Sequence, residues 1–216
     1  MIKAFLFDLD GVITDTSEFH FLAWQKLGED LGIPFSREDN EALRGVSRRE
    51  SLRLLLKGRE VTEEQAQSYM ERKNNYYLEL VHQMGPQNLL PGAREMLEET
   101  HELGLKRAIV SVSKNSQLVI DKLGIGGLID GLIDGHAPAR SKPFPDLFLL
   151  GAQLFRLEPH ECLVIEDATA GIQAAHAAGM KAVGLGPLER VGEAELVLTS
   201  LEGQTAKGIL ERLKVS

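Results

Sequence analysis

Short apolar runs that end in small or acidic residues recur along the chain, and they constrain its fold more than any other feature of the sequence. Helical stretches separate the later runs, and Gly104 and Gly179, which are suited to ending a helix, precede two of them. Runs without polar alternation, separated by helices, are typical of a parallel sheet that is covered on both faces. We therefore predict an α/β fold with strands at residues 3–7 (KAFLF), 107–112 (RAIVSV), 162–166 (CLVIE), 181–185 (KAVGL) and 195–198 (ELVL).

The segment from residue 15 to residue 85 has a different pattern. It contains no strand-like run, and its apolar residues recur at helical spacing, as in Phe19, Leu22 and Leu27. Thr62 and Gln65 form a capping-box pattern, which marks the start of a further helix. We predict a small α-helical cap domain at residues 15–85, inserted after the first strand into a core domain of residues 1–14 and 86–216.

The composition limits the partners of the protein. A chain of 216 residues with a formal net charge of -8 and a sequence pI near 5.3 repels nucleic acid and anionic lipid over most of its surface. The single cysteine, Cys162, lies in an apolar run and is expected to pack inertly in a reducing compartment. Because Asp8 and Asp10 interrupt the N-terminal apolar run, we expect no signal peptide, no membrane span and a cytoplasmic location.

Polar side chains stand where the predicted strands end. In the first stretch, FDLDGVITD, the strand must stop near Asp8 for Asp8 and Asp10 to lie close together, and Gly11 favours such a stop. Later strand ends and the SKPFPD loop supply Ser111, Lys142, Glu166 and Asp167. Ligands of parallel sheets bind beyond the carboxyl ends of the strands. Carboxylates that converge there repel by about 4 kcal/mol per pair at ~4 Å. We therefore expect a bound cation, and oxygen ligands favour Mg²⁺ over zinc.

Each of these groups also has a simpler structural explanation. The simpler roles are a turn for Asp8, a helix start for Ser111, Ser113, Lys114 and Asn115, a solvated loop for Glu166 and Asp167, a packing pair for His20 and Trp24, and surface charges for Arg44 and Arg48. These explanations lose force together, because all the groups fall at strand ends or on the predicted cap that faces them.

Several motifs along the chain carry a family resemblance. FDLDGVITDT, SVSKN, KPFPD and VIEDATAGIQAAHAAGM resemble the successive motifs of the haloacid dehalogenase-like phosphotransferase superfamily, and the resemblance covers essentially the whole chain. Within it, DGVITDT, HFLAW, RGVSRRESL and SKN resemble the β-phosphoglucomutase family. The resemblance implies a Rossmann-like catalytic core with a helical cap. It also implies an isomerase that interconverts β-glucose 1-phosphate and glucose 6-phosphate through glucose 1,6-bisphosphate.

The resemblance assigns roles to the residues at the strand ends. Asp8 is expected to attack phosphorus and become an aspartyl phosphate, and Asp10 to act as general acid and base. The implied Mg²⁺ ligands are the Asp8 carboxylate, the Asp10 backbone carbonyl, Glu166 and Asp167. Ser111 and Lys142 are expected to hold the oxygens of the transferring phosphoryl group.

The cap and the facing loop are expected to bind the rest of the substrate. Arg48, Ser113, Lys114 and Asn115 resemble a second, distal phosphate site, which a bisphosphate intermediate requires. The resemblance implies that His20 orients Asp10, that Trp24, Arg44, Gly45 and Val46 line the sugar pocket, and that Thr16, Ser47 and Val112 complete the substrate-binding set. The family carries a lysine where Arg44 stands. We expect a monomer with Mg²⁺ as cofactor and a phosphorylated hexose as substrate.

Other functions use similar residues. A capped sugar-phosphate phosphatase would share the chemistry of Asp8 and Asp10, and the second phosphate site with Arg48, Lys114 and Asn115 separates it from a mutase. A signalling receiver module also gathers acidic residues, a hydroxyl and a lysine, but such modules are shorter and have no cap. Dehalogenase activity is disfavoured by the presence of Asp10, which such chemistry does not require.

Overall fold

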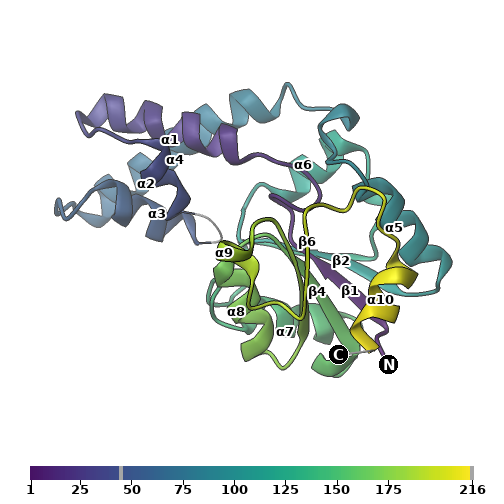
Figure 1. Ribbon diagram of the computed structural model, residues 1–216. Helices are drawn as coiled ribbons and strands as arrows, with labels where there is room; N and C mark the ends of the chain where they lie inside the picture. Colours follow the sequence, from purple (N-terminus) through teal and green to yellow (C-terminus); the bar gives the residue numbers. More distant parts are fainter. Residues whose placement is uncertain (44–45, 215–216) are drawn as a thin grey trace.

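The computed structural model describes residues 1–43 and 46–214 and contains a twisted parallel sheet (Figure 1). Within these residues the sheet has six strands in the order β3-β2-β1-β4-β5-β6. The strands are β1 (Ala4–Phe7), β2 (Lys106–Val110), β3 (Gly131–Ile133), β4 (Cys162–Glu166), β5 (Lys181–Leu185) and β6 (Leu196–Leu198). All neighbouring strands pair in parallel, so the carboxyl ends of the strands share one edge of the sheet.

The predicted α/β fold is confirmed, with one strand missed. Each apolar run named from the sequence forms a strand within a residue or two of its expected bounds. The missed strand, β3, has three residues, all of them half-buried at the edge of the sheet. Such a short segment, GLI, carries too few apolar residues to reveal a strand period. Gly104 and Gly179 have φ angles of 70° and 76°, the left-handed conformation expected of residues that end helices.

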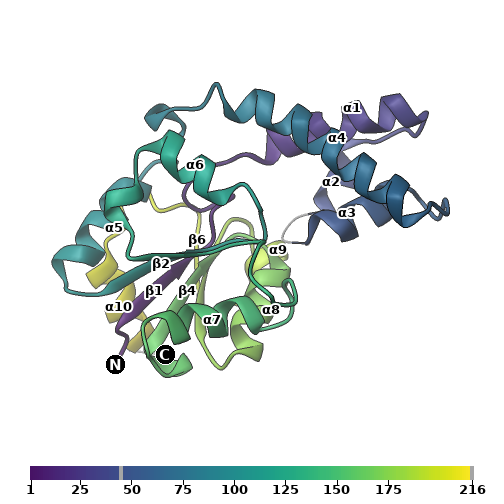
Figure 2. The same ribbon diagram turned by 180° about the vertical axis from the view of Figure 1, so that it is seen from behind.

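Helices cover both faces of the sheet, as Figure 2 shows. Phe5 and Phe7 of β1 belong to the apolar cluster formed with α5 (Ala93–Glu102), α6 (Ser116–Leu123) and α10 (Ala206–Lys214). Ala4 and Leu6 belong to the opposite cluster, with α7 (Asp146–Leu154), α8 (Thr169–Ala177) and α9 (Leu188–Val191). Cys162 is fully buried in this second cluster, and burial raises the pKa of its thiol to about 11, which agrees with inert packing. The sheet therefore has an apolar core on each face.

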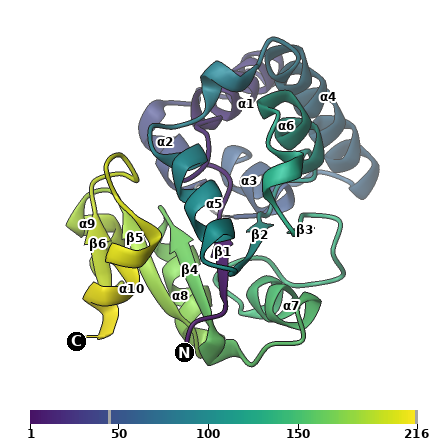
Figure 3. The same ribbon diagram turned by 90° about the vertical axis from the view of Figure 1, so that its right-hand side faces the viewer.

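Four further helices lie beyond the carboxyl edge of the sheet, at the end opposite the chain termini (Figure 3). They are α1 (Ser17–Leu31), α2 (Arg37–Glu41), α3 (Arg48–Leu55) and α4 (Glu63–Val81). Phe21, Trp24, Leu27 and Leu52 are among the residues of a separate apolar cluster that holds these helices together. The expected capping box of Thr62 and Gln65 begins α4. We call this helical unit the cap; its exact boundaries at residues 15 and 85 stay a prediction.

Three short 3₁₀ helices complete the described elements: η1 (Pro86–Asn88), η2 (Gly126–Leu128) and η3 (Pro159–Glu161). The first of them lies where the chain returns from the cap to the core. In the described part of the chain, no helix combines the length and the apolar character that crossing a membrane requires.

Candidate active site

A buried lysine joins the ends of three strands. Asp8 follows β1 directly, and its backbone N–H donates to the carbonyl of Ile165 at 2.9 Å. Lys142 donates to Asp8 Oδ1 and to Glu166 Oε1, both at 2.5 Å, and to the Val110 carbonyl at 3.1 Å. The Lys142 side chain is 1% exposed. The ammonium group thus ties the ends of β1, β2 and β4 together.

Both carboxylate oxygens of Glu166 have partners within the protein. While Oε1 accepts from Lys142, Oε2 accepts from the backbone N–H groups of Asp167 at 2.8 Å and Ala168 at 2.9 Å. Glu166 therefore fixes the loop between β4 and α8 and holds Lys142 in place. This arrangement favours an indirect role for Glu166 near a metal, with direct ligation left to other oxygens.

Burial and neighbouring charges perturb the titration of Asp8 and Lys142. Burial raises the pKa of Asp8 well above its ordinary value; Lys142 opposes this rise, and Glu166, Asp167 and Asp10 add to it. Burial alone would lower the pKa of Lys142, but the Asp8 and Glu166 carboxylates raise it above the ordinary value. Lys142 therefore stays charged, while the gathered carboxylates still call for a further cation.

The donor chemistry at this edge fits Mg²⁺. Among residues 1–43 and 46–214, no three His, Cys, Asp or Glu side chains are arranged as a metal-binding group. The expected ligand set included Glu166, but both oxygens of Glu166 are bonded within the protein. The direct donors would then be the carboxylates of Asp8 and Asp167 and the backbone carbonyl of Asp10. These oxygen donors suit a hard cation, and Mg²⁺ usually keeps several waters and takes only one or two carboxylates. The residues present therefore fit a magnesium ion.

Asp10 is connected to the start of the cap. Its carboxylate accepts a short hydrogen bond from the Thr16 hydroxyl and a second bond from the Thr16 backbone N–H at 3.3 Å. The Tyr77 hydroxyl of α4 donates to Thr16 Oγ1 at 3.2 Å. Burial raises the pKa of Asp10 above its ordinary value, although the Thr16 hydrogen bonds oppose the rise. A raised pKa suits a carboxyl group that must both donate and accept a proton.

Lys73 of α4 is a site residue that the sequence analysis missed. It is 2% exposed, and its Nζ lies 2.7 Å from His20 Nδ1 and 4.9 Å from the ring centroids of both Trp24 and Tyr77. His20 stacks on Tyr77 with ring centroids 4.2 Å apart. Burial, followed by the charges of Lys73 and Arg48, lowers the pKa of His20 well below its ordinary value. His20 is therefore neutral at pH 7.

A signal for Lys73 exists in the sequence. Ala66, Lys73, Tyr77 and Val81 are the buried residues of α4, so Lys73 is a charged residue on an otherwise apolar helical stripe. A lysine at such a position is almost never fully buried unless it is paired. Its presence on the stripe therefore indicates a partner on the facing helix, here His20 of α1.

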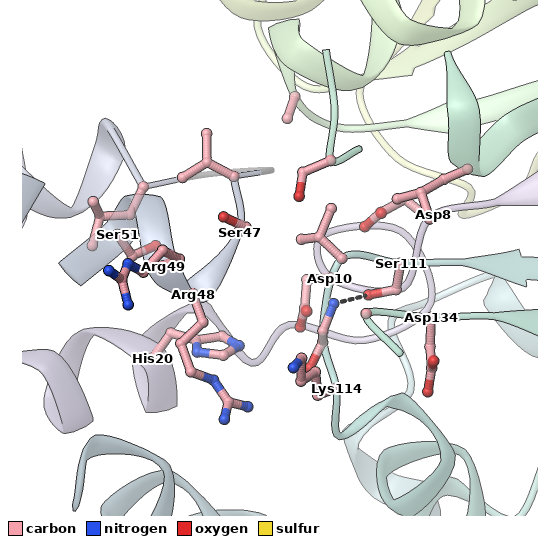
Figure 4. A pocket seen from close by; sticks show the side chains of 18 of the residues that line it. Asp8, Asp10, His20, Ser47, Arg48, Arg49, Ser51, Ser111, Lys114 and Asp134 are labelled. Atoms are coloured by element: carbon pink, nitrogen blue, oxygen red, sulfur yellow. Dashed lines mark hydrogen bonds between the residues drawn. The ribbon is translucent and has the colours of Figure 1, made fainter. Parts of the chain in front are cut away.

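The loop after β2 is ordered by its own hydroxyl groups. The Ser113 backbone N–H donates to Ser111 Oγ at 3.1 Å, the bond drawn in Figure 4, and the Asn115 N–H donates to Ser113 Oγ at 3.2 Å. The Asn115 side chain donates to Asn74 Oδ1 of the cap at 2.8 Å. The loop is thus shaped before any ligand arrives, and it contacts both the core and the cap.

A cavity of about 300 Å³ separates the cap from the carboxyl edge of the sheet. In Figure 4, Asp8, Asp10, Ser111, Lys114 and Asp134 lie on one side, and His20, Ser47, Arg48, Arg49 and Ser51 lie on the other. Of the predicted site residues, the cavity is lined by Asp8, Asp10, His20, Trp24, Val46, Ser47, Arg48, Ser111, Val112, Ser113, Lys114, Glu166 and Asp167. The cavity is large enough to hold a sugar phosphate in contact with both sides.

Some expected residues lie elsewhere. Thr16, Lys142 and Asn115 do not line the cavity; Thr16 is buried against Asp10, and Lys142 lies behind Asp8 and Glu166. Arg44 and Gly45 lie outside the described residues. The cavity also includes Met70, Glu71 and Asp134. Asp134 directly follows the missed strand β3, whereas Met70 and Glu71 had no strand-end or motif signal in the sequence.

Comparisons with known proteins show the family to which the chain belongs. The model of the haloacid dehalogenase-like hydrolase family matches residues 2–179. A β-phosphoglucomutase of Bacillus subtilis is 42% identical over 201 residues, which cover 91% of this chain and 89% of the relative. The solved structure of β-phosphoglucomutase from Clostridium difficile superposes with a TM-score of 0.96 at 38% identity, covering 100% of this chain and 98% of that one. A phosphorylated carbohydrates phosphatase of Thermotoga maritima is 26% identical over 84% of both chains.

Proposed function

Since the chain belongs to the haloacid dehalogenase-like hydrolase family, we propose that it is a phosphomutase that interconverts β-D-glucose 1-phosphate and D-glucose 6-phosphate. The intermediate is glucose 1,6-bisphosphate, which also acts as activator. The similarity to two β-phosphoglucomutases over nearly their whole lengths supports isomerase activity over simple hydrolysis.

One structural observation carries this proposal: a single cavity connects the Asp8 edge to a second group of cations. Lys114 of the core and Arg48 and Arg49 of the cap line the same space as Asp8 and Asp10. A bisphosphate needs two anion sites at once, and an arginine can clamp a phosphate through two donors. The local cations also resolve the problem that a chain with net charge -8 poses for an anionic ligand.

Asp8 is the proposed nucleophile. A carboxylate oxygen of Asp8 attacks phosphorus, the bond from phosphorus to the sugar oxygen breaks, and an aspartyl phosphate forms. In the next half-reaction a hydroxyl of the second sugar position attacks this phosphorus and regenerates the free carboxylate. Ser111 is proposed to orient the phosphoryl oxygens, as expected from the sequence. Lys142, which was expected to bind them too, is bonded to Asp8 and is proposed to keep its carboxylate in place.

Asp10 is the proposed general acid and base. It gives a proton to the departing sugar oxygen when Asp8 is phosphorylated, and it takes a proton from the attacking hydroxyl in the reverse transfer. Thr16 and Tyr77 link Asp10 to the cap. Cap closure can therefore place Asp10 against the substrate oxygen and exclude water, which would otherwise hydrolyse the aspartyl phosphate.

Members of this family generally depend on Mg²⁺, and here Asp8, Asp167 and the Asp10 carbonyl would hold the ion. When bound, Mg²⁺ offsets the negative charge that builds up on the transferring phosphoryl group. We also propose that the protein acts as a cytoplasmic monomer on a phosphorylated hexose, with the core at residues 1–14 and 86–216 and the cap at residues 15–85.

A coupled assay tests the proposal directly. The protein is supplied with β-glucose 1-phosphate, Mg²⁺ and a trace of glucose 1,6-bisphosphate, and glucose 6-phosphate and inorganic phosphate are measured in the same tube. We expect glucose 6-phosphate to form well ahead of phosphate. Release of phosphate without glucose 6-phosphate would make the protein a phosphatase with the same Asp8 and Asp10 chemistry. Formation of neither product would overturn the sugar assignment.

A further inference from the structure

Arg190 lies behind the acidic edge of the sheet, outside the substrate cavity. It belongs to the short helix α9, which follows β5. With Gly11, Asp15, Asp167, Gly186 and Ser200, it lines a second cavity of about 220 Å³ on the far side of the loop between β1 and the cap. Neither a motif nor a strand end draws attention to this arginine in the sequence.

Arg190 and the loop after β4 are joined by hydrogen bonds in both directions. The Arg190 Nε–H donates to the Asp167 backbone carbonyl at 2.7 Å. In return, the Thr169 hydroxyl donates to the Arg190 backbone carbonyl at 2.7 Å. We call these two bonds the Arg190 clasp. Because one bond uses the side chain and the other the main chain of Arg190, the clasp fixes both the loop and α9.

The guanidinium group contacts the main chain of Asp167 more closely than its carboxylate. Arg190 Nη2 lies 3.8 Å from Asp167 Oδ2, which is beyond hydrogen-bond distance, whereas the bond to the carbonyl is short. Arg190 therefore does not occupy a carboxylate oxygen of Asp167 by a hydrogen bond. Because its hydrogen bond goes to the main chain, Arg190 can position the Asp167 carboxylate without a hydrogen bond to its oxygens, although the two groups still form an ion pair at 3.8 Å.

The guanidinium group of Arg190 packs closely against Gly186. A Cβ atom at Gly186 would lie 2.6 Å from Arg190 Nη2, so the group packs directly on the backbone of this glycine. The side chain of Arg190 is 29% exposed, and that of Asp167 is 8% exposed. Arg190 thus contacts the loop after β4 from the side of the second cavity, while Asp167 also lines the substrate cavity.

We propose that Arg190 is a positioning residue, which holds the main chain of Asp167 so that its carboxylate is presented to a divalent cation. This inference rests on the proposed function, since that function assigns Asp167 to the metal. Partners outside the direct ligand set commonly change metal affinity by about 10–100-fold when they are removed. The clasp would be such a partner for the Asp8, Asp10 and Asp167 site.

The test is a titration of the full-length, metal-free protein with Mn²⁺, in which free Mn²⁺ is followed by electron paramagnetic resonance without substrate. We expect Arg190→Gln to weaken Mn²⁺ binding about tenfold. Thr169→Val, which removes only the returning hydroxyl, should weaken it less. Because Arg190→Gln keeps the backbone carbonyl that accepts from Thr169, the double variant should bind Mn²⁺ at least as weakly as Arg190→Gln alone. Glu189→Gln, on the exposed side of the same helix, is the matched control and should bind Mn²⁺ as the unchanged protein does.

The outcomes separate this inference from the proposed function. Unchanged or tighter Mn²⁺ binding in Arg190→Gln would overturn the inference and leave the phosphomutase proposal intact. If that variant fails to fold, Thr169→Val decides, and unchanged binding there overturns the clasp. Failure of the unchanged protein to bind Mn²⁺ would overturn both the inference and the metal part of the proposed function, whereas failure of the coupled sugar assay would leave the Mn²⁺ result standing.

Discussion

The charged side chains on the two sides of the substrate cavity differ in burial and in hydrogen bonding. On the core side, Lys142 is bonded to Asp8, Glu166 and the Val110 carbonyl, and its side chain is almost fully buried. On the cap side, Arg49 is 54% exposed and paired with Glu63, another surface residue. The groups for phosphoryl transfer are therefore fixed in advance, whereas Arg49 of the cap lies at a hydrated surface.

This difference indicates how the work is divided. Buried charges that are fully hydrogen-bonded need little reorganisation during reaction, so the core can supply the same chemistry to any phosphate ester. Exposed cations of the cap gain strength only when closure removes water around them. The core should therefore determine whether phosphoryl transfer occurs, and the cap should determine which molecule receives the phosphoryl group.

The largest effect is expected from Asp8→Asn. An amide cannot form the aspartyl phosphate, so we expect turnover to fall by a factor of about 10⁴ or more for both sugar phosphates and small aryl phosphates. Asp15→Asn, at an exposed carboxylate bonded to Ser17, is the control and should keep near-normal turnover. Mg²⁺-dependent turnover in Asp8→Asn would contradict the role of Asp8 and, with it, the assignment of the chemistry to the core.

The next effect concerns stability. Lys142→Met leaves the Asp8 and Glu166 carboxylates buried without their cation, which is expected to cost about 3–5 kcal/mol in the free energy of unfolding. The folded-state pKa of Asp8 is already raised, and loss of Lys142, which opposes that rise, raises it further. A carboxyl group whose pKa is higher in the folded state than in the unfolded state stabilises the folded state at low pH. That stabilisation is lost as pH increases from the unfolded pKa through the folded pKa. The deficit should thus be larger at pH 8 than at pH 5.

Denaturant unfolding at both pH values measures this deficit. The matched control is Lys3→Met, because Lys3 is 57% exposed and its bond to Glu161 is a surface pair worth about 1 kcal/mol or less. If Lys142→Met and Lys3→Met lost the same free energy of unfolding, the buried network around Lys142 would stabilise the protein no more than a surface ion pair does. The core side of the cavity would then not be more firmly fixed than the cap side.

The core side could be predicted from the sequence better than the cap side. Asp8, Ser111, Glu166 and Asp167 directly follow apolar runs, and parallel pairing brings the ends of such runs together whatever the details of packing. By contrast, contact between Lys73 and His20 depends on how α4 packs against α1, and these residues are far apart in the chain. Strand β3 was missed because three half-buried residues carry no period.

The functions of individual side chains were also harder to predict than their positions. Glu166 has the expected location, but both of its oxygens bind protein groups, one of them a lysine in a distant loop. Arg190 donates to the backbone carbonyl of Asp167, and any residue type at position 167 would supply such a carbonyl. Hydrogen bonds to main-chain atoms leave no pattern in the sequence, so such roles emerge only from the folded structure.

Arg48→Ala sharpens the comparison from the cap side. A hydrogen-bonded contact to a charged group contributes about 1.5–3 kcal/mol. Loss of a distal phosphate ligand should therefore reduce mutase turnover by roughly 10–100-fold, while hydrolysis of a small aryl phosphate, which has no distal phosphate, should change little. Arg37→Ala, at an exposed cap arginine paired with Glu18, is the control for cap charge. Equal losses in both reactions would place Arg48 in the shared chemistry and blur the division between core and cap.

The smallest effect is a change in titration within the cap. Burial is the main cause that lowers the pKa of His20, and the charges of Lys73 and then Arg48 lower it further. Lys73→Met removes a neighbouring cation at 2.7 Å but leaves His20 buried, so the pKa of His20 should rise part of the way toward its ordinary value. Arg48→Ala should shift it in the same direction by less, and Lys26→Met, at an exposed lysine of α1, should not shift it. The NMR signal of the His20 ring, followed against pH, reports all three variants. An unchanged His20 pKa in Lys73→Met would mean that Lys73 is uncharged in the folded protein, and the cap would then hold its buried polar groups as neutral partners, unlike the charged network of the core.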